Sequence, residues 1–128
     1  IYHSLGRREA EREAAHRGLE RAERELARNP DNARPIYLGA TILATIGEVE
    51  RAKEWAARAL AIDPDDVLTQ YNIACFCCFV GEFDRALDLL ETMLPRSNHE
   101  TKTWVLHDSD FEPLHNLPRW QKILALTK

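Results

Sequence analysis

The same succession of turn and helix residues occurs twice in this 128-residue chain, and the two copies lie 34 residues apart. Gly47 corresponds to Gly81, and the turn at Pro30 corresponds to the turn at Pro64 with the same spacing. The residues after each glycine also match: Glu48 with Glu82, Val49 with Phe83, Ala52 with Ala86 and Leu60 with Leu94. A fixed period of this length is typical of proteins built from stacked copies of one supersecondary unit.

Each copy predicts two helices joined by a glycine turn. Apolar residues recur at helical spacing over residues 33–46 and again over residues 48–61. Gly47 ends the first helix because glycine tolerates the left-handed conformation that a helix end requires. Pro64 ends the second helix, and one of the two aspartates that follow it is expected to cap the next helix. Each copy is therefore expected to form a helical hairpin.

The segment before the first full copy is expected to be one long helix. Gly6 stands farther from Pro30 than Gly47 stands from Pro64, and the difference is about two helical turns. With Gly6 as the turn glycine, the sequence predicts a helix over residues 7–28. We interpret its many charged residues mainly as a solvated surface, and a charged face that binds a partner is the alternative.

Residues 101–128 depart from the repeat and are expected to close its open end. An apolar piece at residues 104–106 precedes an aspartate-rich turn. Asn116 is a candidate cap for a last helix, and Pro118 suits the first turn of that helix. The residues expected to cover the core of the last repeat are Trp104, Phe111, Leu114, Trp120 and Leu124.

Composition and charge exclude several classes of protein. A formal net charge of −4 argues against a dedicated nucleic-acid binder, which needs a basic face. The longest apolar run, residues 73–80, is too short to span a membrane. Three clustered cysteines cannot form a disulfide framework, which favours a reducing, cytoplasmic setting. We therefore expect no nucleic-acid partner and no membrane association.

No group of residues in the sequence is typical of an enzyme or a metal site. The cysteines within residues 75–78 lack the second ligand pair of a closed zinc site, and no base that would activate a thiol is evident. Residues 108–112 are similar to the start of a calcium loop, but Pro113 stands where that loop needs glycine and Arg119 where it needs glutamate. We predict no catalytic residues, no metal and no cofactor. An enzyme that uses the cysteines is the alternative from another class.

The pattern over residues 33–100 resembles the tetratricopeptide repeat (TPR) family. With residue 33 as position 1, the resemblance rests on the small residue at position 8, the glycine at 15, the alanine at 20 and the proline at 32: Ala40 and Ala74, Gly47 and Gly81, Ala52 and Ala86, and Pro64. The family implies an all-α fold, a right-handed α-solenoid of helix-turn-helix hairpins with a C-terminal capping segment. It further implies a single domain, 1–128, with a partial repeat at 1–32, repeats at 33–66 and 67–100, and the cap at 101–128.

The closing segment resembles the end of TPR regions in large bacterial multidomain proteins. Its aspartate-rich turn, Pro-Leu pair and Pro-Arg-aromatic sequence carry this resemblance. Such regions follow an adenylate-cyclase, TolB-like or serine/threonine-kinase portion. The resemblance implies a bacterial protein, and a first residue other than Met predicts a fragment.

In the TPR family, the first helix of each hairpin lines a concave groove that holds a peptide or a partner helix. The resemblance places the groove positions at Arg34, Tyr37, Leu38, Thr41, Ala44 and Thr45, and at Leu68, Tyr71, Asn72, Cys75, Cys78 and Phe79. We predict partner binding by all of these except Ala44 and Cys78. Asn72 is the best single candidate, because an amide can both donate to and accept from a peptide backbone.

We therefore predict a non-catalytic protein–protein interaction module that acts as a scaffold or regulatory arm. Its partner is a protein or peptide. The first alternative is an intramolecular partner, the N-terminal part of the same chain, which would be a signalling enzyme of cyclase or kinase type. The second is self-assembly into a homo-oligomer.

Overall fold

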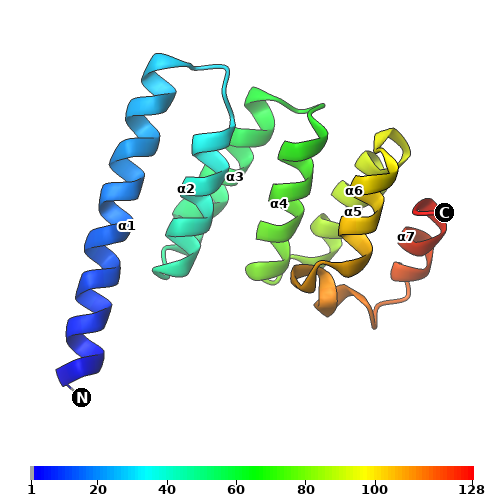
Figure 1. Cartoon of the computed structure of the whole chain (residues 1–128). Coiled ribbons are helices and arrows are strands. Elements are labelled where there is room, and N and C mark those ends of the chain that lie inside the picture. Colours follow the sequence, from blue (N-terminus) through cyan, green and yellow to red (C-terminus); the bar gives the residue numbers. More distant parts are fainter. Residues whose placement is uncertain (1) are drawn as a thin grey trace. The chain divides into compact units, whose positions relative to one another are not determined.

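The computed structural model describes the backbone of residues 2–128 and the side chains from residue 6 onward, and every element it describes is helical. The elements in chain order are α1 (Tyr2–Arg28), α2 (Arg34–Thr45), α3 (Val49–Ile62), α4 (Val67–Phe79), α5 (Phe83–Met93), η1 (Leu94–Arg96), α6 (His99–His107), η2 (Ser109–Leu114) and α7 (Trp120–Leu126) (Figure 1). The all-α prediction is confirmed for the described residues. The chain divides into two compact units, unit 1 (Ile1–Asp63) and unit 2 (Pro64–Lys128).

In unit 1, α2 and α3 form a closely packed antiparallel hairpin (Figure 1). The buried residues at its centre are Ile36, Ala40 and Leu43 of α2 and Ala52, Ala56 and Ala59 of α3. Gly39 allows an especially close approach, because a Cβ atom there would lie 2.2 Å from Cζ3 of Trp55. No real side chain tolerates such a distance, so the Trp55 ring occupies the space that any other residue at position 39 would need.

Helix α1 packs along α2 through small and aliphatic residues at helical spacing. Its buried residues are Ala15, Leu19, Ala22 and Leu26. The predicted long helix is confirmed, but Gly6 lies inside it, so the prediction of a turn at Gly6 is wrong. Among the described residues, only Gly47 and Gly81 have positive φ angles, and Gly6 adopts no turn conformation of this kind.

The turns at Gly47 and Gly81 have the same structure. Their φ angles are 89° and 84°, in the left-handed region that favours glycine. The same two backbone hydrogen bonds close each turn: from Glu48 N to Leu43 O and from Gly47 N to Ala44 O in unit 1, and from Glu82 N to Cys77 O and from Gly81 N to Cys78 O in unit 2. The 34-residue period of the sequence is therefore also a period of the backbone conformation.

In unit 2, side-chain hydrogen bonds fix the start of the α4–α5 hairpin. Asp66 caps α4, because its Oδ2 accepts from the Thr69 amide at 2.9 Å. The buried Gln70 amide donates to Pro64 O at 3.0 Å and accepts from Arg96 at 2.8 Å. Because both ends of this buried amide are hydrogen-bonded, its desolvation is compensated.

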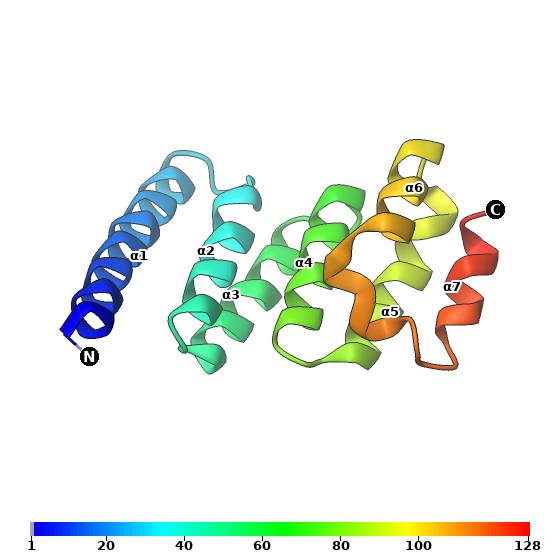
Figure 2. The ribbon, with the colours of Figure 1, turned by 60° about the horizontal axis from the view of Figure 1, so that its bottom comes forward.

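The C-terminal part of unit 2 folds back on α4 and α5 (Figure 2). Asn98 caps α6 by accepting from the Thr101 amide at 2.8 Å, so this helix starts earlier than the predicted apolar piece. The prediction that Asn116 caps the last helix is wrong, because α7 begins at Trp120 without a side-chain cap. Arg119 holds the start of α7 instead, and its Nη2 lies 2.7 Å from Asp88 of α5.

No helix among the described residues combines the length and the apolar character needed to cross a bilayer.

Candidate interaction surfaces

Three of the predicted partner-binding positions carry large apolar side chains that remain at the surface. On α4 of unit 2, Leu68 is 52% exposed and Phe79 is 63% exposed. On α2 of unit 1, Leu38 is 48% exposed. Because these exposed apolar side chains stand at positions predicted to bind a partner, they are candidates for contact with another protein.

A cleft of about 350 Å³ lies between α4 and α6 of unit 2. Its apolar wall consists of Val67, Leu68, Tyr71 and Trp104, and Trp104 is itself 47% exposed. The rings of Tyr71 and Trp104 meet edge to face, with centroids 6.3 Å apart. The polar residues of the cleft are Asp66, Arg96, Ser97, Asn98 and Thr101. The sequence placed Trp104 in the closing segment as core cover, and its place in this cleft was missed.

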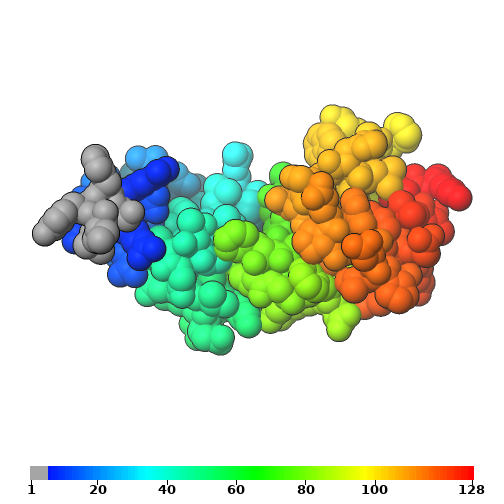
Figure 3. Space-filling model, turned by 90° about the horizontal axis from the view of Figure 1, so that it is seen from below, coloured from blue at the N-terminus to red at the C-terminus, as the bar shows by residue number. Residues whose placement is uncertain are grey.

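The η2 segment covers the middle of α4. The Tyr71 hydroxyl donates a hydrogen bond to Asp108 Oδ2, and the Tyr71 ring packs edge to face on Phe111 with centroids 5.5 Å apart. In the space-filling view, the orange η2 segment lies directly against the green α4 helix (Figure 3). Tyr71 and Cys75, both predicted to face a partner, therefore face the chain's own closing segment.

Cys75, Asp108 and Asp110 form the only group of potential metal ligands found in the part of the chain that the structure describes. Their ligand atoms lie within 4.8 Å of one another, and thiolate and carboxylate are ligand types that zinc accepts. Both oxygens of Asp108 already accept hydrogen bonds, one from Tyr71 and one from the Asp110 amide at 2.9 Å. The arrangement therefore serves to attach η2 to α4. The sequence did not reveal it because Cys75 lies far from the two aspartates along the chain.

The electrostatic surroundings of the cysteines keep their thiols protonated. Burial, together with the charges of Asp108 and Asp110, raises the pKa of Cys75 well above its usual value. Burial raises the pKa of Cys77 to about 11 and the pKa of Cys78 to about 12. Because the thiolate is the nucleophile and the metal ligand, these thiols are poorly suited to either role near neutral pH.

Several predicted polar contacts are made within their own helices. The Asn72 amide donates to Leu68 O at 2.9 Å, so one of the two N–H donors expected to clamp a peptide backbone is already in use. The Thr41 hydroxyl donates to Tyr37 O at 3.2 Å, and the Thr45 hydroxyl donates to Thr41 O at 2.9 Å. A partner would have to compete with these bonds only for the donated hydrogens, since the side-chain oxygen of each of the three groups can still accept a hydrogen bond.

Arg34 and Tyr37 differ in what they offer a partner. Arg34 is exposed at the first turn of α2, where it is accessible to a carboxylate. Tyr37 is only 6% exposed, so it supplies little contact area in this conformation.

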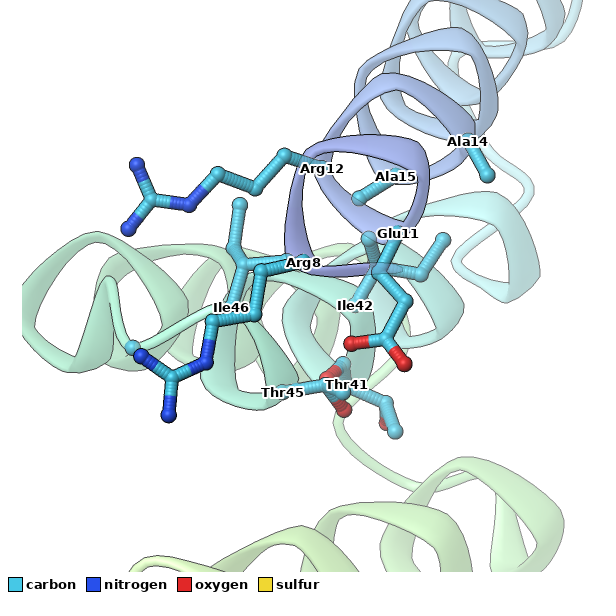
Figure 4. Close-up of a pocket in the computed structure, with 10 residues that line it drawn as sticks. Arg8, Glu11, Arg12, Ala14, Ala15, Thr41, Ile42, Thr45 and Ile46 are labelled. Carbon is cyan, nitrogen blue, oxygen red and sulfur yellow. The ribbon is translucent and has the colours of Figure 1, made fainter. Parts of the chain in front are cut away.

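A groove of about 690 Å³ lies in unit 1 between the N-terminal half of α1 and the C-terminal half of α2. The predicted residues Thr41 and Thr45 belong to its α2 side, together with Ile42 and Ile46. Its α1 side consists of Arg8, Glu11, Arg12, Ala14 and Ala15. Figure 4 shows the Arg8 and Arg12 side chains projecting to the same side of α1, with Ile46 between them in this view.

The contribution of α1 to this groove is not evident from the sequence. Acidic and basic residues follow one another along nearly the whole helix, so no charged face stands out in the sequence. Only the packing of Ala15 and Leu19 against the rest of unit 1 shows which arginines border a groove.

Searches against models of known protein families, against curated proteins and against solved structures found no match to this chain.

Proposed function

We propose that this chain is a non-catalytic protein-binding module built from TPR-type hairpins, and that it acts as a scaffold or regulatory arm. The turns at Gly47 and Gly81 support the TPR assignment, because they share their φ region and their hydrogen bonds at the 34-residue period. The alanines at position 20 of each repeat, Ala52 and Ala86, support it as well, since both are fully buried.

The observation that carries the proposal is the exposure of Leu38, Leu68 and Phe79. Each stands at a position where the family binds its partner, and each leaves about half or more of its apolar surface in water. Binding of a protein would bury this surface, and burial of apolar area contributes about 25 cal/mol for each Å². Catalysis finds no comparable support, because the raised pKa values of the cysteines disfavour nucleophilic thiolates.

The test is affinity capture from a lysate of the source organism with wild-type protein and a Leu68→Ser/Phe79→Ser variant. Both side chains are exposed, so we expect the variant to keep its thermal midpoint within a few degrees. A partner that uses this face should be retained by wild-type protein and lost from the variant. Its identity follows from mass spectrometry of the retained material.

The matched control replaces Ala57 and Ala61 of α3 with serine, since both are exposed on a helix that the family does not use for its groove. The control should retain the same partner as wild-type protein. If wild-type protein and the Leu68/Phe79 variant retain identical sets of proteins, the proposed binding face is wrong.

A further inference from the structure

The groove between α1 and α2 of unit 1 has two positive charges without partners among the described residues. Arg8 and Arg12 stand one helical turn apart on its α1 side. The acidic residue of the same wall, Glu11, lies 3.5 Å from Arg7, which lies outside the groove. Because two arginines of the α1 side face a single acidic residue, the groove keeps an excess of positive charge.

The opposite side of the groove carries two isoleucines beside Thr41 and Thr45, and the isoleucines have the same spacing as the arginines. Ile42 of α2 lies four residues before Ile46, which directly follows the last residue of α2, and both are only partly buried. Ala15 of α1, a small buried residue, lines the groove together with the two isoleucines. Residues four apart on a helix are separated by about 6 Å along its axis, so the arginine row and the isoleucine row repeat with the same step.

We propose that this groove binds an amphipathic α-helix of a partner protein. The partner's apolar side chains pack on Ile42 and Ile46, and its acidic side chains, one turn apart, pair with Arg8 and Arg12. A helix presents an apolar row and an adjacent acidic row with this repeat, which an extended peptide does not. The inference rests on the proposed protein-binding function, but it uses a surface of unit 1 that is separate from Leu68 and Phe79.

An acidic helix fits this groove better than a nucleic acid or a lipid surface. The chain as a whole carries a formal net charge of −4, which repels extended anionic surfaces, so attraction is confined to the vicinity of Arg8 and Arg12. The apolar residues lie in a recess instead of on a protruding face, and a bilayer cannot enter a recess of about 690 Å³. Guanidinium groups also match the geometry of carboxylates.

The test is selection from a displayed library of 16-residue helix-forming peptides that is randomised at one apolar row and one adjacent charged row. The expected winners carry Asp or Glu at i and i+4 beside an apolar row. Their affinity should fall about tenfold in the Arg8→Gln/Arg12→Gln variant, because two exposed ion pairs are lost, and tenfold corresponds to about 1.4 kcal/mol for the two together. Binding should also weaken as salt concentration rises.

The matched control is Arg21→Gln/Arg24→Gln, which removes the same charge from exposed positions of α1 outside the groove. This control should bind the selected peptides as wild-type protein does. Glu11→Gln should have the opposite effect on affinity, because removal of the only acidic residue that lines the groove should tighten binding by about twofold to threefold. All of these side chains are exposed, so we expect each variant to fold.

Each of the following results would overturn the proposal. The first is a set of winners without an acidic preference, and the second is binding that the two arginine variants weaken equally. The third is a peptide with the acidic row but with serine in place of its apolar row that binds as well as the winners, since that would reveal charge attraction without docking. Winners that depend on Leu68 and Phe79 but not on Arg8 and Arg12 would leave the proposed function intact and reject this site.

Discussion

Units 1 and 2 contain the same hairpin turn, yet they differ in what covers the first helix of the hairpin. In unit 1, the groove beside α2 is open and bordered by charged residues of α1. In unit 2, the η2 segment lies on α4, where Asp108 and Phe111 contact Tyr71. The repeat therefore supplies the helices, while the flanking segments determine which part of each helix stays accessible to a partner.

The two hairpins also differ in the residues that pack at equivalent positions between their two helices. Gly39 and Trp55 of unit 1 correspond, at the 34-residue period, to Ile73 and Leu89 of unit 2. The Trp55 ring fills the space above Gly39, whereas Ile73 itself is buried in unit 2. Unit 1 thus has a small and a large residue at the positions where unit 2 has two residues of medium size.

Copying the residue of unit 2 into unit 1 tests this difference and should give the largest effect. Gly39→Ile places side-chain atoms where the Trp55 ring lies, since even a Cβ would be 2.2 Å from the ring. We expect a loss of about 3 kcal/mol in the free energy of unfolding, measured by urea denaturation.

The double variant Gly39→Ile/Trp55→Leu supplies the control, because it transplants the complete pair of unit 2. It should recover a substantial part of the lost stability, which would appear as a favourable coupling energy in a double-mutant cycle. Additive losses would mean that the two positions are not packing equivalents.

A second test asks whether the two hairpins share one crossing geometry. Ala52 and Ala86 are equivalent and fully buried, so Ala52→Leu and Ala86→Leu should each overpack a hairpin. We expect each to cost about 2 kcal/mol, with similar values for the two units, in thermal or urea unfolding. An unchanged midpoint for one of them would show that its hairpin is packed differently. Ala57→Leu, on the exposed side of α3, is the control and should have little effect.

The third test weakens the attachment of the η2 segment to α4 in unit 2. Asp108→Ala deletes the acceptor of the Tyr71 hydrogen bond and the cap of η2, which should cost about 1.5 kcal/mol. Because Asp108 also raises the pKa of the Cys75 thiol, the variant should react faster with a thiol reagent at that residue. Tyr71→Phe is the control for loss of the hydrogen bond alone, since it removes the hydroxyl but keeps Asp108 and the ring that packs on Phe111. Equal labelling of Cys75 in wild-type protein and Asp108→Ala would contradict the covering role of η2.

Local sequence signals predicted the hairpins well. The positive φ angles of Gly47 and Gly81 follow from the needs of a helix end, which depend on neighbouring residues alone. Asp66 caps α4 for the same reason. Where a local signal competed with a distant contact, the prediction failed: Asn116 looked like a cap, but the ion pairs of Arg119 with α5 fix the start of α7.

The candidate sites were harder to predict because they depend on contacts between distant parts of the chain. Nothing near Tyr71 in the sequence indicates that Phe111 will pack on its ring. The arginines of the unit 1 groove look like the other arginines of α1 until the helix is placed against α2. The resemblance to the TPR family specifies which positions line the groove, and this identified Leu38, Leu68 and Phe79 as binding residues. Apolar periodicity alone would have assigned the three residues to the core.

The smallest expected difference between the units concerns alkaline pH. Unit 2 contains all three cysteines, and the pKa of Cys77 is raised to about 11 and that of Cys78 to about 12 in the folded chain. Unfolded thiols ionise near pH 8.5, so above that pH the unfolded state loses protons that the folded state keeps. Stability should therefore be constant below about pH 8 and fall as the pH rises, by about 0.4 kcal/mol for each buried thiol at pH 8.5.

The measurement is urea unfolding of wild-type protein and of a Cys75→Ser/Cys77→Ala/Cys78→Ala variant between pH 7 and pH 9.5. The cysteine-free variant should be less stable at neutral pH, because the buried sulfur atoms are lost from the core. Its stability should nevertheless depend less on pH than that of wild-type protein, and the gap between the two should narrow above pH 8.5. Parallel pH profiles would show that the thiols of unit 2 ionise as easily in the folded chain as in the unfolded one, and the two units would then not differ in this respect.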